Sequence, residues 1–110
     1  MVLLEFSIAP LEKGASVSDY VARSLTIIEE SGLDYRLHAM GTIVEGELDD
    51  CLAVLKKCLD SMAADCDRIT CTAKLDYRRG YSGRLQTKVT SVEEKLGRKL
   101  KTIEGERGAR

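Results

Sequence analysis

The hydrophobic pattern of this chain switches repeatedly between a period of two, typical of strands, and a period of 3.6, typical of helices. Alternating apolar residues predict four strands, at residues 2–8, 34–38, 41–45 and 68–77. Apolar residues spaced three and four positions apart predict three helices, at residues 17–31, 48–64 and 84–97. The resulting order, β-α-β-β-α-β-α, restricts the fold more than any other feature of the sequence.

Two β-α-β halves joined by right-handed crossovers form a four-stranded antiparallel sheet with two helices on one face. We therefore expect an α+β fold, a ferredoxin-like βαββαβ sandwich with an additional C-terminal helix. With 110 residues the chain is long enough for one domain. Residues 1–97 should form this single domain, and residues 98–110 a flexible or partly helical tail, because only Leu100 and Ile103 there offer apolar side chains.

The expected sheet has one face beneath the helices and one face that its own helices leave uncovered. The apolar sides of the first and last strands should lie beneath the helices. The uncovered face then carries Leu3, Glu5 and Ser7 from the first strand and Thr70, Thr72, Lys74 and Asp76 from the last. We expect Glu45 to join them, because burying its charge under the helices without a partner would be costly.

Two interpretations of this polar face remain open. It can be a hydrated surface with cross-strand ion pairs, in which Glu5 or Glu45 faces Lys74. It can also be covered by another subunit, with a ligand at the seam, since small single-sheet domains often gain stability by oligomerising.

Composition and charge exclude several classes of function. The 17 basic and 18 acidic residues give a net charge of −1, which does not favour binding to nucleic acid or to an anionic membrane. The N-terminal apolar run has no basic leader and contains Glu5, so it predicts a strand rather than a signal peptide. No segment approaches the ~20 apolar residues of a membrane span. We expect a soluble cytoplasmic protein.

No pattern in the sequence predicts a metal site, a cofactor or catalysis. The four cysteines, Cys51, Cys58, Cys66 and Cys71, form no C-x-x-C pair. We expect them to be reduced, with Cys51 and Cys58 buried as small hydrophobes, although a Cys66–Cys71 bridge stays open. His38 is the only histidine, and no nucleophile-elbow or phosphate-loop motif accompanies it. We therefore expect no metal-binding and no catalytic residues.

Three segments carry a resemblance to a known family: SIAPLEKGASVSDYVA, SGLDYRLHAMGTIVEGE and RITCTAKLDYRRG, the last followed by KVTSVEEKLG. Their most telling parts are the MGT-x-x-EGE run from Met40 to Glu47 and the pattern Lys74-x-Asp76-x-Arg78. Across residues 2–97 the order and spacing of these parts resemble the thiamine-binding-protein-like family. Tyr77 departs from that pattern, since it stands before Arg78 where the family leads us to expect Asp.

The resemblance implies a ferredoxin-like fold assembled through its sheets into dimers and tetramers. It also implies non-catalytic binding of thiamine, or of its hydroxymethylpyrimidine part, near a subunit interface. The positions that match the family pattern and can line the pocket are Ser7, Ser16, Ser18, Met40, Thr42 and Glu45. The alternative is a structural or regulatory oligomeric module without a thiamine ligand.

The chemistry of these residue types suits such a ligand. Hydroxyls and a carboxylate can satisfy the donors and acceptors of an aminopyrimidine edge. A carboxylate or a thioether can also face the permanently cationic thiazolium. His38 is either a strand-edge residue with a plain hydrogen bond or a further pocket contact.

Overall fold

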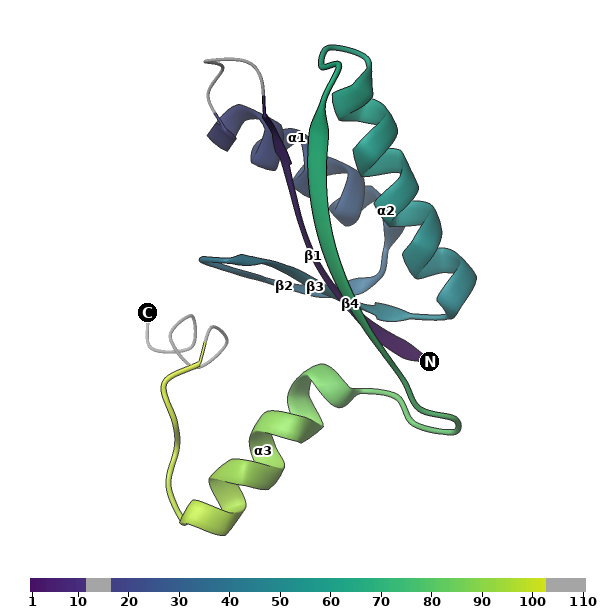
Figure 1. Cartoon of the computed structure of the whole chain (residues 1–110). Helices are drawn as coiled ribbons and strands as arrows, with labels where there is room; N and C mark the ends of the chain where they lie inside the picture. Colours follow the sequence, from purple (N-terminus) through teal and green to yellow (C-terminus); the bar gives the residue numbers. More distant parts are fainter. Residues whose placement is uncertain (12–16, 103–110) are drawn as a thin grey trace.

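Seven elements follow one another along the chain in the predicted order (Figure 1). The computed structural model describes residues 1–11 and 17–102. The strands are β1 (Val2–Pro10), β2 (Asp34–His38), β3 (Gly41–Gly46) and β4 (Ile69–Tyr77), and the helices are α1 (Val17–Ser31), α2 (Leu48–Ala63) and α3 (Arg84–Leu96). The predicted α+β, ferredoxin-like class with an additional C-terminal helix is confirmed.

The sheet is built around β1, which is paired on both sides. The strand order is β2-β3-β1-β4, and all neighbours are antiparallel. β1 pairs with β4 along its whole length, from Val2 opposite Tyr77 to Pro10 opposite Ile69. Its pairing with β3 ends earlier, at Phe6 opposite Thr42. The last four residues of β1, Ser7 to Pro10, therefore have a neighbouring strand on one side only.

The core lies between the sheet and the helices α1 and α2. Leu4 of β1, Val44 of β3 and Ile28 of α1 are almost completely buried in it. Full burial of such a side chain contributes about 1.5–3 kcal/mol. Cys51 and Cys58 of α2 are buried in the same cluster as free thiols, as predicted. Burial raises the pKa of both thiols, so they remain protonated and act as small apolar groups.

The uncovered face has the composition that strand alternation predicts. Glu45 lies opposite Leu3 in the β1–β3 pair, so it belongs to the uncovered face as expected. The contacts that the carboxylates make on this face differ from the expected pairs with Lys74. The Glu5 carboxylate of β1 lies instead 3.2 Å from Nε2 of His38, the last residue of β2. Within β2, the Asp34 carboxylate pairs with the Arg36 guanidinium at 2.7 Å.

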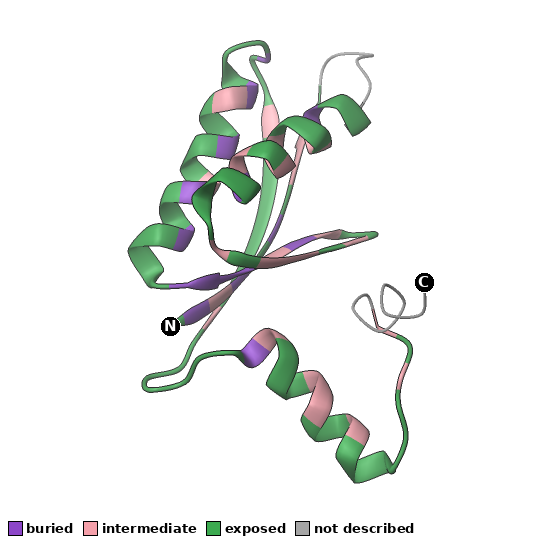
Figure 2. Cartoon of the chain, turned by 180° about the vertical axis from the view of Figure 1, so that it is seen from behind, coloured by how far each residue is buried: buried purple, intermediate pink, exposed green. Residues whose placement is uncertain are grey.

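The prediction that the apolar side of the last strand lies beneath the helices is correct only for Ile69, which packs against the buried cluster of Tyr20, Met62 and Cys66. The core centres on β1 and β3, with α2 packed over them rather than over β4. Leu75 and Tyr77 of β4 are on the helix side of the sheet but remain 41% and 56% exposed. Figure 2 shows most of β4 and the outer side of α2 as exposed.

Helix α3 forms where the sequence predicts it but leaves the body of the domain (Figure 1). It ends at Gly97, whose positive φ of 70° provides the left-handed C-cap. Its apolar stripe remains largely open, with Val92 48% and Leu96 51% exposed. Beyond it, the backbone N–H of Leu100 donates to Glu93, while residues 103–110 of the predicted tail lie outside the described residues.

No helix in the described ranges combines the length and the apolar character that crossing a bilayer requires. The same part of the chain contains no cluster of His, Cys, Asp and Glu side chains that could hold a metal ion.

Gly41 begins β3 at a point where the β2–β3 hairpin comes very close to β1. A Cβ atom at this position would lie 2.7 Å from the backbone oxygen of Phe6. Real Cβ atoms do not approach a carbonyl so closely, and a backbone atom in a central strand cannot rotate away. The absence of a side chain is therefore what allows the hairpin to lie against β1.

We expect Gly41→Ala to lower the free energy of unfolding by about 1–3 kcal/mol through this overlap. The matched control is Gly46→Ala, where the obstacle is the flexible end of Leu33, Cδ2, at 2.8 Å. Urea denaturation of both variants measures the difference. A loss for Gly41→Ala no larger than for Gly46→Ala would contradict the assigned close approach.

Candidate functional site

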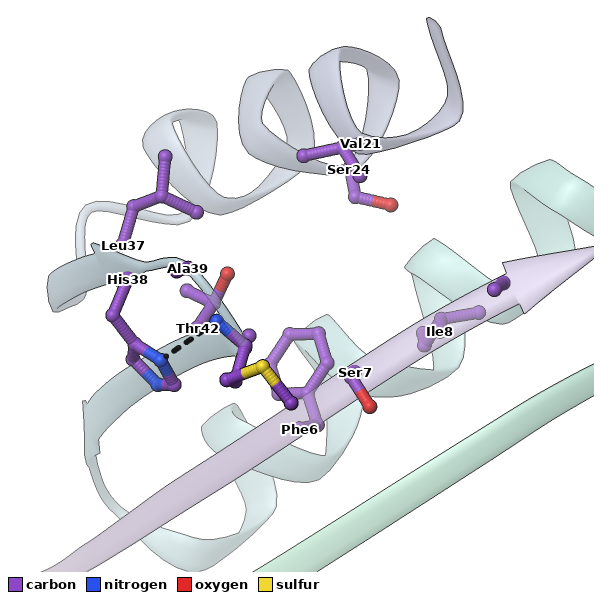
Figure 3. A pocket seen from close by; sticks show the side chains of 12 residues that line it. Phe6, Ser7, Ile8, Val21, Ser24, Leu37, His38, Ala39 and Thr42 are labelled. Carbon is purple, nitrogen blue, oxygen red and sulfur yellow. Dashed lines mark hydrogen bonds between the residues drawn. The ribbon is translucent and has the colours of Figure 1, made fainter. Parts of the chain in front are cut away.

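A cavity of about 250 Å³ opens where β3 ends and β1 continues. Its floor is the part of β1 from Phe6 to Ala9, where the pairing with β3 ends, and its wall is the tip of the β2–β3 hairpin, residues 37–42. Val21 and Ser24 of α1 close it from above (Figure 3). The cavity thus forms because β1 extends beyond the end of β3, and α1 lies over the part of β1 that β3 does not flank.

The lining is mainly apolar, with a few hydroxyl groups. The Phe6 ring forms one side, and the hydroxyls of Ser24 and Thr42 face the space between α1 and the hairpin (Figure 3). Neither hydroxyl has a hydrogen-bond partner within residues 1–11 and 17–102. A ring-shaped guest in this cavity would therefore find an aromatic surface and two groups able to donate or accept hydrogen bonds.

The hairpin tip is held by its histidine. The Nδ1 atom of His38 accepts a hydrogen bond of 3.2 Å from the backbone N–H of Met40 (Figure 3). A neutral imidazole that accepts at Nδ1 carries its proton on Nε2, which lies 3.2 Å from the Glu5 carboxylate. This contact lacks the alignment of a hydrogen bond, so the neutral imidazole and the carboxylate interact only as a dipole near a charge. His38 combines both roles that the sequence left open, because it also lines the cavity.

The structure brings together some of the sequence-predicted site residues. Ser7, Met40 and Thr42 all line the cavity, and Met40 is 82% exposed at its rim. Ser18 is an exposed residue in the first turn of α1 and is not among the lining residues. Ser16 lies outside the described residues. The ligand-binding role of the whole set stays a prediction.

Glu45 is away from the cavity and has a partner within the chain. The residue is only 6% exposed, and its carboxylate accepts a hydrogen bond of 2.9 Å from the backbone N–H of Arg84, the first residue of α3. Helix α3 has no side-chain cap of its own, because Gly83 precedes it. A carboxylate at a helix N-terminus is stabilised by the helix dipole, so Glu45 serves α3 as a cap from another element.

Asp76 completes the attachment of α3 to the sheet. Its carboxylate pairs with the buried guanidinium of Arg84 and, at 2.7 Å, with Lys88. The hydrogen bond from Lys88 and the charge of Arg84 lower the pKa of Asp76, against the opposing effect of desolvation. Two carboxylates that the sequence assigns to the uncovered face thus hold the first turns of α3.

Sequence reasoning missed Ser24 and Phe6 as cavity residues. Phe6 belongs to the apolar row of β1, and nothing in the sequence distinguishes it from a core residue. Ser24 carries a usable signal, because it is a small polar residue three positions after Val21 and four before Ile28 on the apolar stripe of α1. A hydroxyl at such a position indicates either a local backbone hydrogen bond or a cavity.

Comparison with known families and proteins identifies relatives of this chain. The sequence model of a family described as thiamine-binding protein matches residues 4–93. UPF0045 protein MJ1052 of Methanocaldococcus jannaschii is 36% identical over 93 residues, which cover 84% of this chain and 93% of that protein. UPF0045 protein YqgV of Bacillus subtilis is 31% identical over 102 residues, covering 87% of this chain and 98% of the relative.

Solved structures share the fold. The crystal structure of the M. jannaschii protein superposes with a TM-score of 0.76 at 35% identity, covering 84% of this chain and 96% of the other. A Thermotoga maritima protein, assigned provisionally to thiamine biosynthesis or salvage, has a TM-score of 0.70 at 20% identity, covering 83% and 97%. At that identity the second likeness concerns the fold alone.

The Asp76 ion pairs predict a pH dependence for the attachment of α3. Because the pKa of Asp76 is lowered in the folded state, its contribution is fully present above the unfolded value of about 3.9 and is lost as the pH falls through the folded value. Amide hydrogen exchange in α3, corrected for intrinsic rates, should therefore accelerate below about pH 4. Asp76→Asn should produce the faster exchange already at pH 7.

Asp60→Asn is the matched control, since it removes the Lys56 partner on the surface of α2 and should leave exchange in α3 unchanged. Equal exchange in α3 for Asp76→Asn and the unaltered chain at pH 7 would contradict the attachment through Asp76.

Proposed function

This chain belongs to the thiamine-binding protein family, and we propose that it binds thiamine, or the hydroxymethylpyrimidine part of it, in the cavity between β1, α1 and the β2–β3 hairpin. The observation that carries the proposal is the meeting of two unpartnered hydroxyls, from Ser24 and Thr42, with the Phe6 ring in one cavity. The elements that form it fall within the residues that match the family.

The size of the cavity supports the pyrimidine as the part that enters. Pockets for drug-sized ligands measure about 300–1,000 Å³, and this one is about 250 Å³. One substituted ring suits such a volume better than two linked rings. In this arrangement the pyrimidine lies against Phe6, with its polar edge toward Ser24 and Thr42. The cationic thiazolium stays at the mouth, where the thioether of Met40 offers a polarizable surface.

We further propose that binding occurs without chemical change of the ligand. A hydrolytic relay would need an imidazole nitrogen directed at a serine hydroxyl. Both nitrogens of His38 are engaged elsewhere, Nδ1 by the backbone of Met40 and Nε2 by the charge of Glu5. Ser7 of β1 also lines the cavity, but within the described residues its hydroxyl forms no hydrogen bond with His38.

The proposed location is the cytoplasm. All four cysteines are free thiols, three of them buried, and Cys66 does not form a bridge with Cys71. Free thiols suit a reducing compartment.

Isothermal titration with thiamine and with hydroxymethylpyrimidine tests the binding site. Thr42→Val preserves the shape of the side chain and removes its hydroxyl. Loss of one neutral hydrogen bond, about 0.5–1.5 kcal/mol, should weaken binding roughly three- to tenfold. Ser24→Ala should have an effect of similar size.

The matched control is Thr72→Val on the uncovered face, which does not line the cavity. It should bind as the unaltered chain does. Weaker binding by Thr72→Val with no change for Thr42→Val would move the site to the uncovered face. No heat and no thermal shift with either compound at millimolar concentration would reject the function.

A further inference from the structure

The tip of the β2–β3 hairpin is a tight turn without the backbone conformation that such turns usually have. His38 pairs with Gly41, so only Ala39 and Met40 form the loop between the two strands. Two-residue hairpin loops usually adopt the primed turn types, in which one or both loop residues have a positive φ. No non-glycine residue in the described part of the chain has a positive φ, so this loop is of another type. Such a loop matches the twist of its strands poorly and benefits from a further hydrogen bond.

The imidazole of His38 supplies this hydrogen bond. Its Nδ1 atom accepts at 3.2 Å from the backbone N–H of Met40, two residues further along the chain. Asn and Asp side chains stabilise turns by accepting from the same position, in the arrangement called an Asx turn. An imidazole can accept there only while Nδ1 carries no proton, which is the case in this neutral form. The bond fixes a loop that forms part of the cavity wall.

The second ring nitrogen of His38 lacks a hydrogen bond because of this orientation. Nε2 is buried and has no hydrogen-bond partner among the residues that the structure describes, although the Glu5 carboxylate lies 3.2 Å away. Buried polar groups are nearly always hydrogen-bonded, so an exception indicates that another interaction sets the position of the ring. Here that interaction is the bond from Met40. One orientation of the ring serves Met40, and a different one is needed to serve Glu5.

We propose that His38 is a positioning residue for the cavity wall and that it holds this wall only in its neutral form. Protonation places a hydrogen on Nδ1, so the imidazolium cannot accept from Met40 and turns to donate from Nε2 to Glu5. The hairpin tip then loses its support, and the wall that carries Met40 and Thr42 becomes less ordered. Given the proposed function, on which this last expectation rests, ligand binding weakens as the pH falls.

The charged groups around the His38 imidazole have both signs. Glu5 of β1 is the carboxylate in contact with it. Arg36 lies two positions earlier in β2 on the same face, where its guanidinium pairs with Asp34. Lys74 of β4 lies opposite Glu5 in the β1–β4 pair. The residues of β3 and α1 that line the cavity carry no charge. An ordinary imidazole changes charge near pH 6.5, so the expected change falls between about pH 5 and 8.

Two variants of His38 separate the hydrogen bond from the charge. His38→Asn places an acceptor oxygen at the position of Nδ1 and takes up no proton in this range. His38→Phe keeps an aromatic ring and removes the acceptor. Isothermal titration with hydroxymethylpyrimidine from about pH 5.5 to about pH 8 compares both with the unaltered chain. Any titration of the compound itself affects all three proteins equally, so the ratios of their Kd values report on His38.

The expected differences are those of one neutral hydrogen bond. At about pH 8, His38→Phe should bind roughly three- to tenfold more weakly than the unaltered chain. As the pH falls to about 5.5, the Kd of the unaltered chain should rise by a similar factor relative to that of His38→Asn. The ratio between the two variants should stay constant. A constant ratio between the unaltered chain and His38→Asn over the whole range would overturn the proposal.

Glu5→Gln tests the assigned partner of the charged form. It removes the negative charge that attracts the imidazolium, so the weakening of binding should begin at a lower pH than in the unaltered chain. Glu30→Gln, which removes an exposed carboxylate from α1, is the matched control and should leave the pH dependence unchanged. The same pH dependence for Glu5→Gln and Glu30→Gln would contradict the turn of the ring toward Glu5.

A measurement without ligand separates the role of His38 from the proposed function. NMR follows the exchange of the Met40 amide with water, and correction for the intrinsic rate gives its protection. In the unaltered chain this protection should fall roughly three- to tenfold as the His38 ring takes up its proton, and it should stay constant in His38→Asn. Absence of any ligand binding would reject the proposed function and leave this result unaffected. Constant protection of Met40 in the unaltered chain during protonation of the ring would overturn the proposal, even if both variants fail to fold.

Discussion

The two-sided pairing of β1 is the constraint on which the rest of this structure depends. Its helix-facing side chains, Val2, Leu4 and Phe6, form the centre of the core, and its backbone aligns β3 on one side and β4 on the other. Because β1 and β4 run beyond the end of β3, the sheet has a step, and α1 lies over it. Because the helices are centred on β1 and β3, β4 remains at a bare edge. The cavity and the exposed edge are consequences of the same arrangement.

The two features differ in character. The cavity is small, mostly apolar and provided with a few hydroxyls, which is the character of a site that holds one heteroaromatic ring by shape and by directed hydrogen bonds. The edge strand β4 has nine residues, and its helix-side residues Leu75 and Tyr77 remain exposed. The cavity lies beside the β2–β3 hairpin, and β4 forms the other edge of the sheet.

The sequence anticipated the candidate site in part. The residues Met40 to Thr42 lie in the cavity wall because they form the tip of the β2–β3 hairpin. The local sequence pattern predicts this tip, because a Gly-containing turn joins two short strands. Ser7 lies beside it through strand pairing. Glu45 has the residue type of a ligand contact, but its carboxylate caps α3, an element 39 positions away. The cost of burying its charge predicted its face correctly, but the sequence could not predict this partner. Ser24 enters the site only through the path of α1 across the sheet.

The sequence by itself determined the order and type of the elements, the identity of the two sheet faces and the burial of Cys51 and Cys58. These depend on hydrophobic periodicity, which acts over a few residues. Only the tertiary structure decided that α2 packs over β1 and β3, that β4 keeps an exposed apolar row, and that α3 is attached to the sheet through Glu45 and Asp76. The period of a strand indicates which side chains share a face. It does not indicate whether a helix covers that face, because the position of a helix over a sheet results from the competition of all side chains for the same core.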